Sequence, residues 1–167
     1  MSPEMSRRIL LALLLALSPL ALALSTDREQ PVEIEADSVD INEAEGISRY
    51  QGEVVIRQGS LYLTADQVTV HHQGRAPARM VAEGTPVRFR QQPDDQALPV
   101  QGEARRAEYT IDSEELLLTG DAELAQGEDR FRSDRIVYDR VRAVVKAGRA
   151  AQGAERVRIT IQPQRAP

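Results

Sequence analysis

The stretch GEVVIRQGSLYLTADQVTV at Gly52–Val70 returns 68 residues later as GDAELAQGEDRFRSDRIVY at Gly120–Tyr138, and this near-repeat decides the fold. The two stretches align without a gap. Their shared positions are Gly52/Gly120, Gln58/Gln126, Gly59/Gly127 and Asp66/Asp134, with apolar matches at Ile56/Leu124, Leu63/Phe131 and Val68/Ile136. A repeat of fixed period is typical of one supersecondary unit that is used again to extend a single hydrophobic surface. Function is therefore expected to reside in a long surface rather than in a few catalytic side chains.

Apolar and polar residues alternate over most of the chain, as in VEIE at 32–35, VRFR at 87–90 and VRITI at 157–161. This alternation predicts strands with one dry and one wet face, as antiparallel sheets have. Turn signals recur at Gly46, Gly52, Gly59, Gly74, Gly84, Gly120, Gly127 and Gly148. At the usual spacing of strand and turn, they predict an all-β domain of roughly 12 to 16 strands.

The alternation slips by one residue at four steps that contain a small residue. These steps are Ala36-Asp37, Ala65-Asp66, Ala104-Arg105 and Ser133-Asp134. A slip would turn a flat strand inside out, so each site must be a bulge or a corner that restores the facing. An Asp at such a corner can accept hydrogen bonds from the exposed amides. The slips predict a sheet that folds over itself, in either a jellyroll or a β-solenoid.

Residues 1–23 have the pattern of a cleavable secretory signal peptide. Arg7 and Arg8 precede the apolar segment Ile9–Leu17, and Ala21-Leu22-Ala23 offers a cleavage site. An uncleaved membrane anchor is the alternative. We expect export of the protein, one β domain over residues 24–162, and a short tail over residues 163–167.

The residues that usually carry catalysis or metal binding are sparse. There is no cysteine, and the net charge is −5 without a basic cluster, which argues against disulfides and nucleic acid. His71 and His72 are adjacent, so in a strand they point to opposite faces and are poor partners for one metal. Acidic pairs fall in predicted turns, and a polysaccharide-cleaving enzyme remains a rival interpretation. We expect no catalytic residue, no metal and no cofactor, and we expect the arginines to lie on a solvated exterior.

The alternation is compatible with two interpretations of the apolar face. It is either the closed core of a sandwich or a groove left partly open. The segments Val32–Ile34 and 156–162 are expected to be terminal strands. An exposed terminal strand can accept a strand of another chain.

Several motifs in a fixed order resemble the OstA-like family of periplasmic lipopolysaccharide transport proteins, the LptA family. They are QPVEIEAD at 30–37, GEVVIRQGSL at 52–61 with TAD at 64–66, EGTP at 83–86 with Phe89, GEA at 102–104 with Tyr109, LTGDA at 118–122, Gly148 and the final VRITIQP at 157–163. The resemblance spans nearly the whole chain after the signal. It implies a single elongated, twisted antiparallel β-jellyroll, V-shaped and open at both ends.

The resemblance also implies a function: lipid A acyl chains of lipopolysaccharide lie inside the jellyroll, and jellyrolls stack head to tail into a bridge between the membranes. The residues expected to bind lipid are Val32, Ile34, Ile41, Val54, Ile56, Leu63, Val68, Phe89, Tyr109, Leu118, Phe131 and Ile136.

The expected docking edges are Val32, Glu33 and Ile34 at the N-terminal end and Val157, Ile159 and Ile161 at the C-terminal end. By the same resemblance, an LptC-like inner-membrane protein meets the first edge, and an LptD-like outer-membrane protein meets the second. The alternatives are an LptC-like membrane-anchored component and a structural β-solenoid without ligand.

Overall fold

The computed structural model describes residues 27–92, 98–142 and 144–161. The expected signal peptide and the expected tail lie outside these residues. Ten strands form one sheet in the order β1-β3-β4-β5-β6-β7-β8-β10, with β2 also paired to β3 and β9 to β8. Their bounds are β1 Glu33–Glu35, β2 Ser38–Asn42, β3 Ile47–Gln58, β4 Leu61–Gln73, β5 Ala76–Gln91, β6 Val100–Thr110, β7 Glu115–Gln126, β8 Asp129–Asp139, β9 Val144–Ala147 and β10 Arg158–Thr160. Two 3-10 turns, η2 (Asp27–Glu29) and η3 (Gly148–Ala151), complete the described chain.

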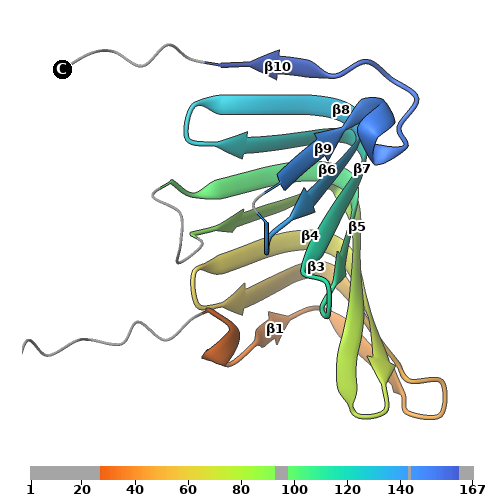
Figure 1. Cartoon of the computed structure of the whole chain (residues 1–167). Coiled ribbons are helices and arrows are strands. Elements are labelled where there is room, and N and C mark those ends of the chain that lie inside the picture. The colour runs from red at the N-terminus through yellow and green to blue at the C-terminus, as the bar shows by residue number, and fades with distance from the viewer. Residues whose placement is uncertain (1–26, 93–97, 143, 162–167) are drawn as a thin grey trace, which may run out of the picture.

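The long strands β3 to β8 are each bent near the middle, and the bends lie side by side at the right of Figure 1. The pairing register is interrupted there in every ladder from β3–β4 to β7–β8. The sheet therefore folds into a V with two leaves. The first leaf holds β1, residues 54–58, 61–65, 87–91, 100–104, 122–126 and 129–133, and β10. The second leaf holds β2, residues 47–51, 67–73, 76–83, 106–110, 115–119 and 135–139, and β9.

This arrangement confirms the predicted all-β antiparallel jellyroll and the predicted corners. Every ladder in the described chain is antiparallel, which rules out a β-solenoid built from parallel coils. The described residues form ten strands, fewer than expected, because Gly52, Gly84 and Gly120 lie at bends within strands rather than at turns between them.

The internal repeat is a repeat of backbone conformation. Gly52 and Gly120 have φ of 82° and 81°, and the next residues Glu53 and Asp121 have 42° and 49°. The hairpin glycines Gly59 and Gly127 have φ of 56° and 60°. Positive φ is readily adopted by glycine, which explains why the repeat keeps it at both places. Hairpins β3–β4 and β7–β8 are therefore two copies of one bent unit.

Aspartates at the corners satisfy backbone amides, as predicted. The Thr85 amide donates to Asp66 Oδ2 at 3.1 Å, and the Ala154 amide donates to Asp134 Oδ2 at 2.7 Å. The hydrogen bond from Ala154 holds the pKa of Asp134 below its ordinary value. Each of these aspartates thus connects its strand to a neighbouring segment beside the bend. The two connections fix the line along which the leaves meet.

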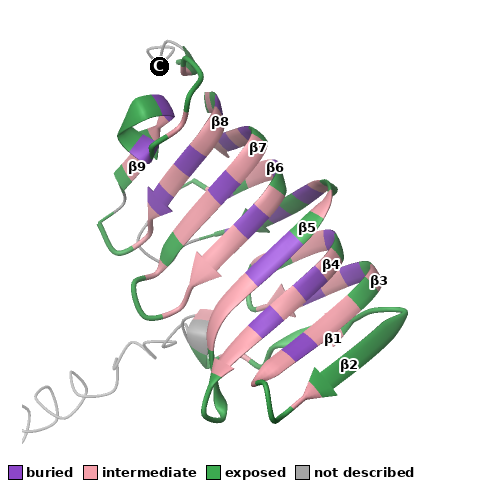
Figure 2. Ribbon diagram, turned by 90° about the vertical axis from the view of Figure 1, so that its right-hand side faces the viewer, coloured by how far each residue is buried: buried purple, intermediate pink, exposed green. Residues whose placement is uncertain are grey.

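The core runs along the inside of this line. Its most deeply buried large side chains are Val54, Val68, Val87, Leu118 and Ile136. Figure 2 shows buried positions recurring along the middle of β3 to β8, whereas β2 is exposed at one end of the sheet. Within the described residues there is no helix that is long and apolar enough to span a bilayer.

Candidate functional site

Three rows of inward-facing residues cross the whole sheet, one along the first leaf and two along the second. Each row is a chain of directly opposed residues on successive strands. The first-leaf row is Ile34, Ile56, Leu63, Phe89, Gly102, Leu124, Phe131 and Ile159. The second-leaf rows are Val39, Tyr50, Val68, Ala82, Ala107, Leu118, Ile136 and Ala147, and Ile41, Ser48, Val70, Met80, Tyr109, Leu116, Tyr138 and Val145. Directly opposed residues lie within contact distance of each other, so the rows form tracks from one end of the sheet to the other that are apolar apart from Ser48.

Ten of the twelve predicted lipid-binding residues fall in these rows. The first-leaf row holds Ile34, Ile56, Leu63, Phe89 and Phe131, and the second-leaf rows hold Ile41, Val68, Tyr109, Leu118 and Ile136. Val54 is in the core beside the bend. Val32 lies just before β1, is exposed, and is outside the rows. Their contact with lipid stays a prediction.

Burial along the rows separates a packed part from an accessible part. Val68, Leu118 and Ile136, close to the bend, are fully buried. Ile34, Leu63, Tyr109 and Phe131 are only partly buried. The pattern in the sequence allowed either a closed core or an open groove, and the fold contains both: the leaves pack tightly at the bend and less tightly away from it.

Away from the bend, a cavity of about 70 Å³ lies between the leaves. Its apolar lining comes from both leaves and consists of Leu61, Leu63, Phe89, Val100, Tyr109, Leu116 and Tyr138, with Gln91 and Arg140 as polar members. Pockets that bury a small ligand have volumes of about 300–1,000 Å³. The cavity is therefore smaller than a pocket that buries a small ligand.

Gly102 is the one position without a side chain in the first-leaf row. A Cβ built on it would lie 2.3 Å from Cε1 of Phe89 and 3.2 Å from the Glu123 carbonyl oxygen. The Phe89 ring thus occupies the space that Gly102 leaves empty. The sequence shows this glycine in the GEA motif, but its packing role depends on the pairing of β5 with β6.

Two charged residues lie at the open side of the V, and neither was predicted. Arg140, which follows β8, donates from Nη1 to the Tyr109 hydroxyl at 3.2 Å, and its guanidinium carbon lies 5.9 Å from the Tyr109 ring centroid. Asp27 accepts hydrogen bonds from the Ser60 amide at 2.7 Å, the Ser60 hydroxyl at 2.6 Å and Gln91 Nε2 at 2.8 Å. Burial alone raises the pKa of Asp27, but these bonds outweigh it and, together with the charge of Arg140, hold the pKa below its ordinary value.

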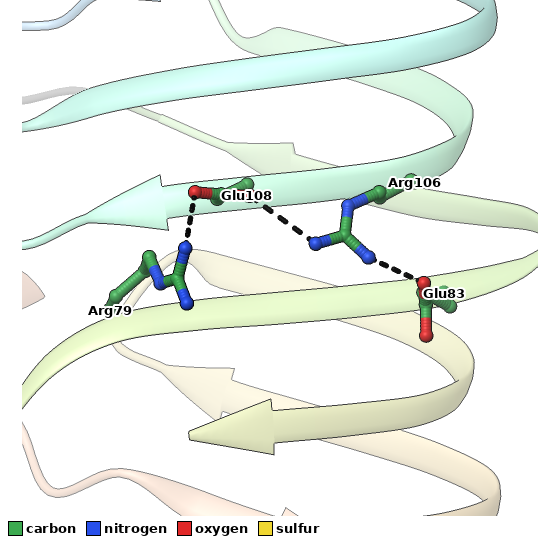
Figure 3. A network of polar contacts seen from close by, with 4 residues as sticks. All are labelled: Arg79, Glu83, Arg106 and Glu108. Carbon is green, nitrogen blue, oxygen red and sulfur yellow. Dashed lines mark hydrogen bonds and ion pairs between the residues drawn. The ribbon is translucent and has the colours of Figure 1, made fainter. Parts of the chain in front are cut away.

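The outer faces of the leaves carry arginine–glutamate pairs, as expected for a solvated exterior. In Figure 3, Arg106 bridges Glu83 at 2.5 Å and Glu108 at 3.4 Å, and Arg79 reaches Glu108 at 3.1 Å. The arginine side chains are more than 40% exposed. Exposed pairs of this kind contribute about 0–1 kcal/mol each, so they favour solubility more than stability.

The acidic residues and histidines considered in the sequence do not lie together at one site in the described residues. Glu43, Glu114 and Glu128 lie in three different hairpin turns, and the pair at 94–95 lies outside the described residues. The His72 Nε2 atom lies 3.1 Å from the Ser48 hydroxyl, and the neighbouring His71 points to the other face of β4. In the described part of the chain, no group of three His, Cys, Asp or Glu side chains is arranged to hold a metal ion.

Both ends of the sheet finish in short strands. In the described chain, β1 and β2 pair only with β3, and β9 and β10 pair only with β8, so each has one open edge. The C-terminal strand is shorter than expected, because only Arg158–Thr160 pair with β8. Large apolar side chains are exposed at both ends: Val32, Val39 and Ile41 at one, Val144, Ile159 and Ile161 at the other.

Comparison with known proteins gives a consistent result. Residues 33–144 match the family model described as "LptA/(LptD N-terminal domain) LPS transport protein". The chain is 33% identical over 162 residues to the lipopolysaccharide export system protein LptA of Haemophilus influenzae. This alignment covers 95% of this chain and 92% of that protein. It is 32% identical over 155 residues to LptH of Pseudomonas aeruginosa, covering 89% and 88% of the two chains. The crystal structure of LptH, titled the LptA-homologous periplasmic component of the lipopolysaccharide transport device, superposes with a TM-score of 0.74 at 29% identity over 83% of this chain and all of that one.

Proposed function

Because the chain belongs to the LptA/LptD N-terminal family of lipopolysaccharide transport proteins, we propose that it is exported by a cleaved signal peptide and carries lipopolysaccharide across the periplasm. The lipid A acyl chains would lie between the two leaves, on the three apolar rows. The observation that carries this proposal is the continuity of the rows, which run without a break from β1 and β2 to β9 and β10. The chain acts as a carrier and catalyses no reaction.

The hydrophobic lining of the groove would allow a bound acyl chain to move along it. Each methylene withdrawn from water contributes about 0.8 kcal/mol. This attraction is non-directional, so an acyl chain can slide along a row without breaking specific bonds. The sequence has no GxxxxGK phosphate-binding loop, and in this proposal the energy for movement comes from a partner.

Loading of an acyl chain would widen the space between the leaves, since the cavity found there has a volume of about 70 Å³. The separation would occur at the open side, where Leu63, Tyr109 and Phe131 are partly exposed. The bend would stay closed, since its side chains are fully buried and its amides are held by Asp66 and Asp134. A V that opens from one side exposes the apolar rows without unfolding the sheet.

The proposal is tested by the dependence of binding on acyl chains. The purified protein is expected to bind lipopolysaccharide saturably and to show no binding of the oligosaccharide released from it by removal of lipid A. Isothermal titration with both ligands makes the comparison. Equal affinity for the two ligands would mean that sugar, and not the groove, is recognised.

We further propose that the two ends of the jellyroll dock to other jellyrolls. The β1/β2 end would meet an LptC-like protein or the β9/β10 end of a second copy, and the β9/β10 end would meet an LptD-like protein. Open strand edges support this, and so do the apolar side chains exposed at both ends. Stacking by strand addition would also join the apolar rows of successive copies.

Replacing Ile159 by Asp is expected to weaken head-to-tail association at least about tenfold, because a carboxylate would have to be desolvated in an apolar contact. Ile159 is 54% exposed in the single chain, so the melting temperature should change little. Thr160→Asp, at the next position of β10, is the matched control. Sedimentation velocity over a concentration series measures the effect. Association that is unchanged in the Ile159 variant, or equally lost in both variants, would contradict docking through this end of the groove.

A further inference from the structure

We propose that Arg140 and the cavity beneath it form a headgroup site, at which the guanidinium binds a phosphate group of the acylated sugar lipid while an acyl chain enters between the leaves. The inference rests on the proposed function, because the site is part of the same groove. It adds a specific polar contact to a groove that is otherwise lined mainly by apolar side chains.

The first support is the position of Arg140. Its backbone amide donates to the Glu114 carbonyl oxygen at 3.1 Å, which fixes the chain just after β8. Its guanidinium lies against the face of Tyr109 and donates to the Tyr109 hydroxyl. Both residues line the cavity, so the cation borders directly on an apolar space.

The second support is the contrast with arginines on the outer faces. Arg57, Arg79, Arg106 and Arg132 are each paired with a glutamate at 2.5–3.1 Å. The Arg140 guanidinium instead donates to a neutral group, the Tyr109 hydroxyl, and lies over the Tyr109 ring. A phosphate oxygen would give the guanidinium a charge-assisted hydrogen bond, which is stronger than one to a neutral hydroxyl.

Arg140 borders the cavity together with apolar and aromatic side chains, and Asp27 is an anionic group near it. Asp27, in η2, lies close enough for the charge of Arg140 to help lower its pKa, and its carboxylate accepts three hydrogen bonds from Ser60 and Gln91. The other lining residues near Arg140 are Leu61, Val100, Leu116 and Tyr138. One cation beside an apolar cavity matches a ligand that joins a phosphate to an acyl chain, and the planar guanidinium fits phosphate oxygens in a bidentate way.

The test compares lipid A that carries its phosphates with lipid A from which they have been removed, using the full-length protein. For Arg140→Gln, the affinity for phosphorylated lipid A is expected to fall about tenfold, since a charge-assisted hydrogen bond is lost. The affinity for the dephosphorylated lipid should not change. Arg140→Lys keeps the charge and should lose less. Arg75→Gln, in the exposed β4–β5 turn, removes the same charge elsewhere and should bind both lipids as the parent protein does.

Three outcomes would overturn the assignment. The first is an Arg140→Gln variant that binds phosphorylated lipid A as tightly as the parent protein. The second is an equal loss of affinity for both lipids, which would make Arg140 a structural residue. The third is competition by inorganic phosphate at concentrations that displace the lipid, which would indicate a simple anion site. If the parent protein binds neither lipid, the proposed function itself fails, and that result is distinct from the other three.

Discussion

Replacing Leu63 by Asp is expected to lower the affinity for lipopolysaccharide at least about a hundredfold while the chain stays folded. Leu63 stands in the middle of the first-leaf row, between Ile56 and Phe89, and also lines the cavity. A carboxylate there would have to lose its water when an acyl chain arrives, at a cost of several kcal/mol, and every 1.4 kcal/mol is a factor of ten. Because Leu63 is only partly buried, the unliganded chain can keep this charge hydrated.

The matched control is Thr64→Asp, one residue further along β4. Successive residues of a strand point to opposite faces, so this variant adds the same charge to the outer face of the same leaf. Both variants are titrated with lipopolysaccharide after circular dichroism has confirmed their fold. The comparison distinguishes the effect of a charge in the groove from the effect of the same charge on the outer face. An equally large loss of affinity in the Thr64 variant would contradict binding of acyl chains in the groove beside Leu63.

Replacing Ile136 by Ala is expected to destabilise the protein by about 2–5 kcal/mol, the range for deletion of a fully buried aliphatic side chain. Ile136 has 0% exposure and lies between Leu118 and Ala147 in the second-leaf row. The deletion leaves a cavity where the leaves pack at the bend. Urea unfolding followed by circular dichroism measures the change in the free energy of unfolding.

Val137→Ala is the control for this prediction, because Val137 is the next residue of β8, faces outward and is partly exposed. Its cost should stay below about 1 kcal/mol, as for most surface substitutions. Similar costs for the two variants would mean that the line of the bend is not the stable core of the fold.

Period-two alternation was enough to predict the facing of the strands, because the side-chain direction in a strand depends only on position. It assigned Ile34 and Phe89, in the alternating segments 32–35 and 87–90, to the dry face correctly. The slips at Ala65-Asp66 and Ser133-Asp134 likewise predicted the corners, since a change of phase has a local cause. The described residues hold fewer strands than expected, because Gly52 and Gly120 have the positive φ of turn residues but lie within strands.

The functional site was less predictable for a physical reason. Alternation assigns a residue to a face, but it carries no information about the distance between two leaves. It therefore could not tell that the rows are closed at the bend and partly open near Leu63 and Tyr109. Arg140 and Asp27 were missed because they belong to a turn and to the start of the domain, where there is no periodicity. They reach the mouth of the groove only through the fold.

The central claim is that acyl chains travel between the leaves, and photo-crosslinking in growing cells tests it most directly. A photo-reactive residue would be placed at Tyr109, which faces the groove, or at Glu108, its neighbour on the outer face of β6. We predict a lipopolysaccharide adduct at position 109 and none above background at position 108. Adducts of equal yield at both positions, or none at position 109 while transport continues, would contradict the account.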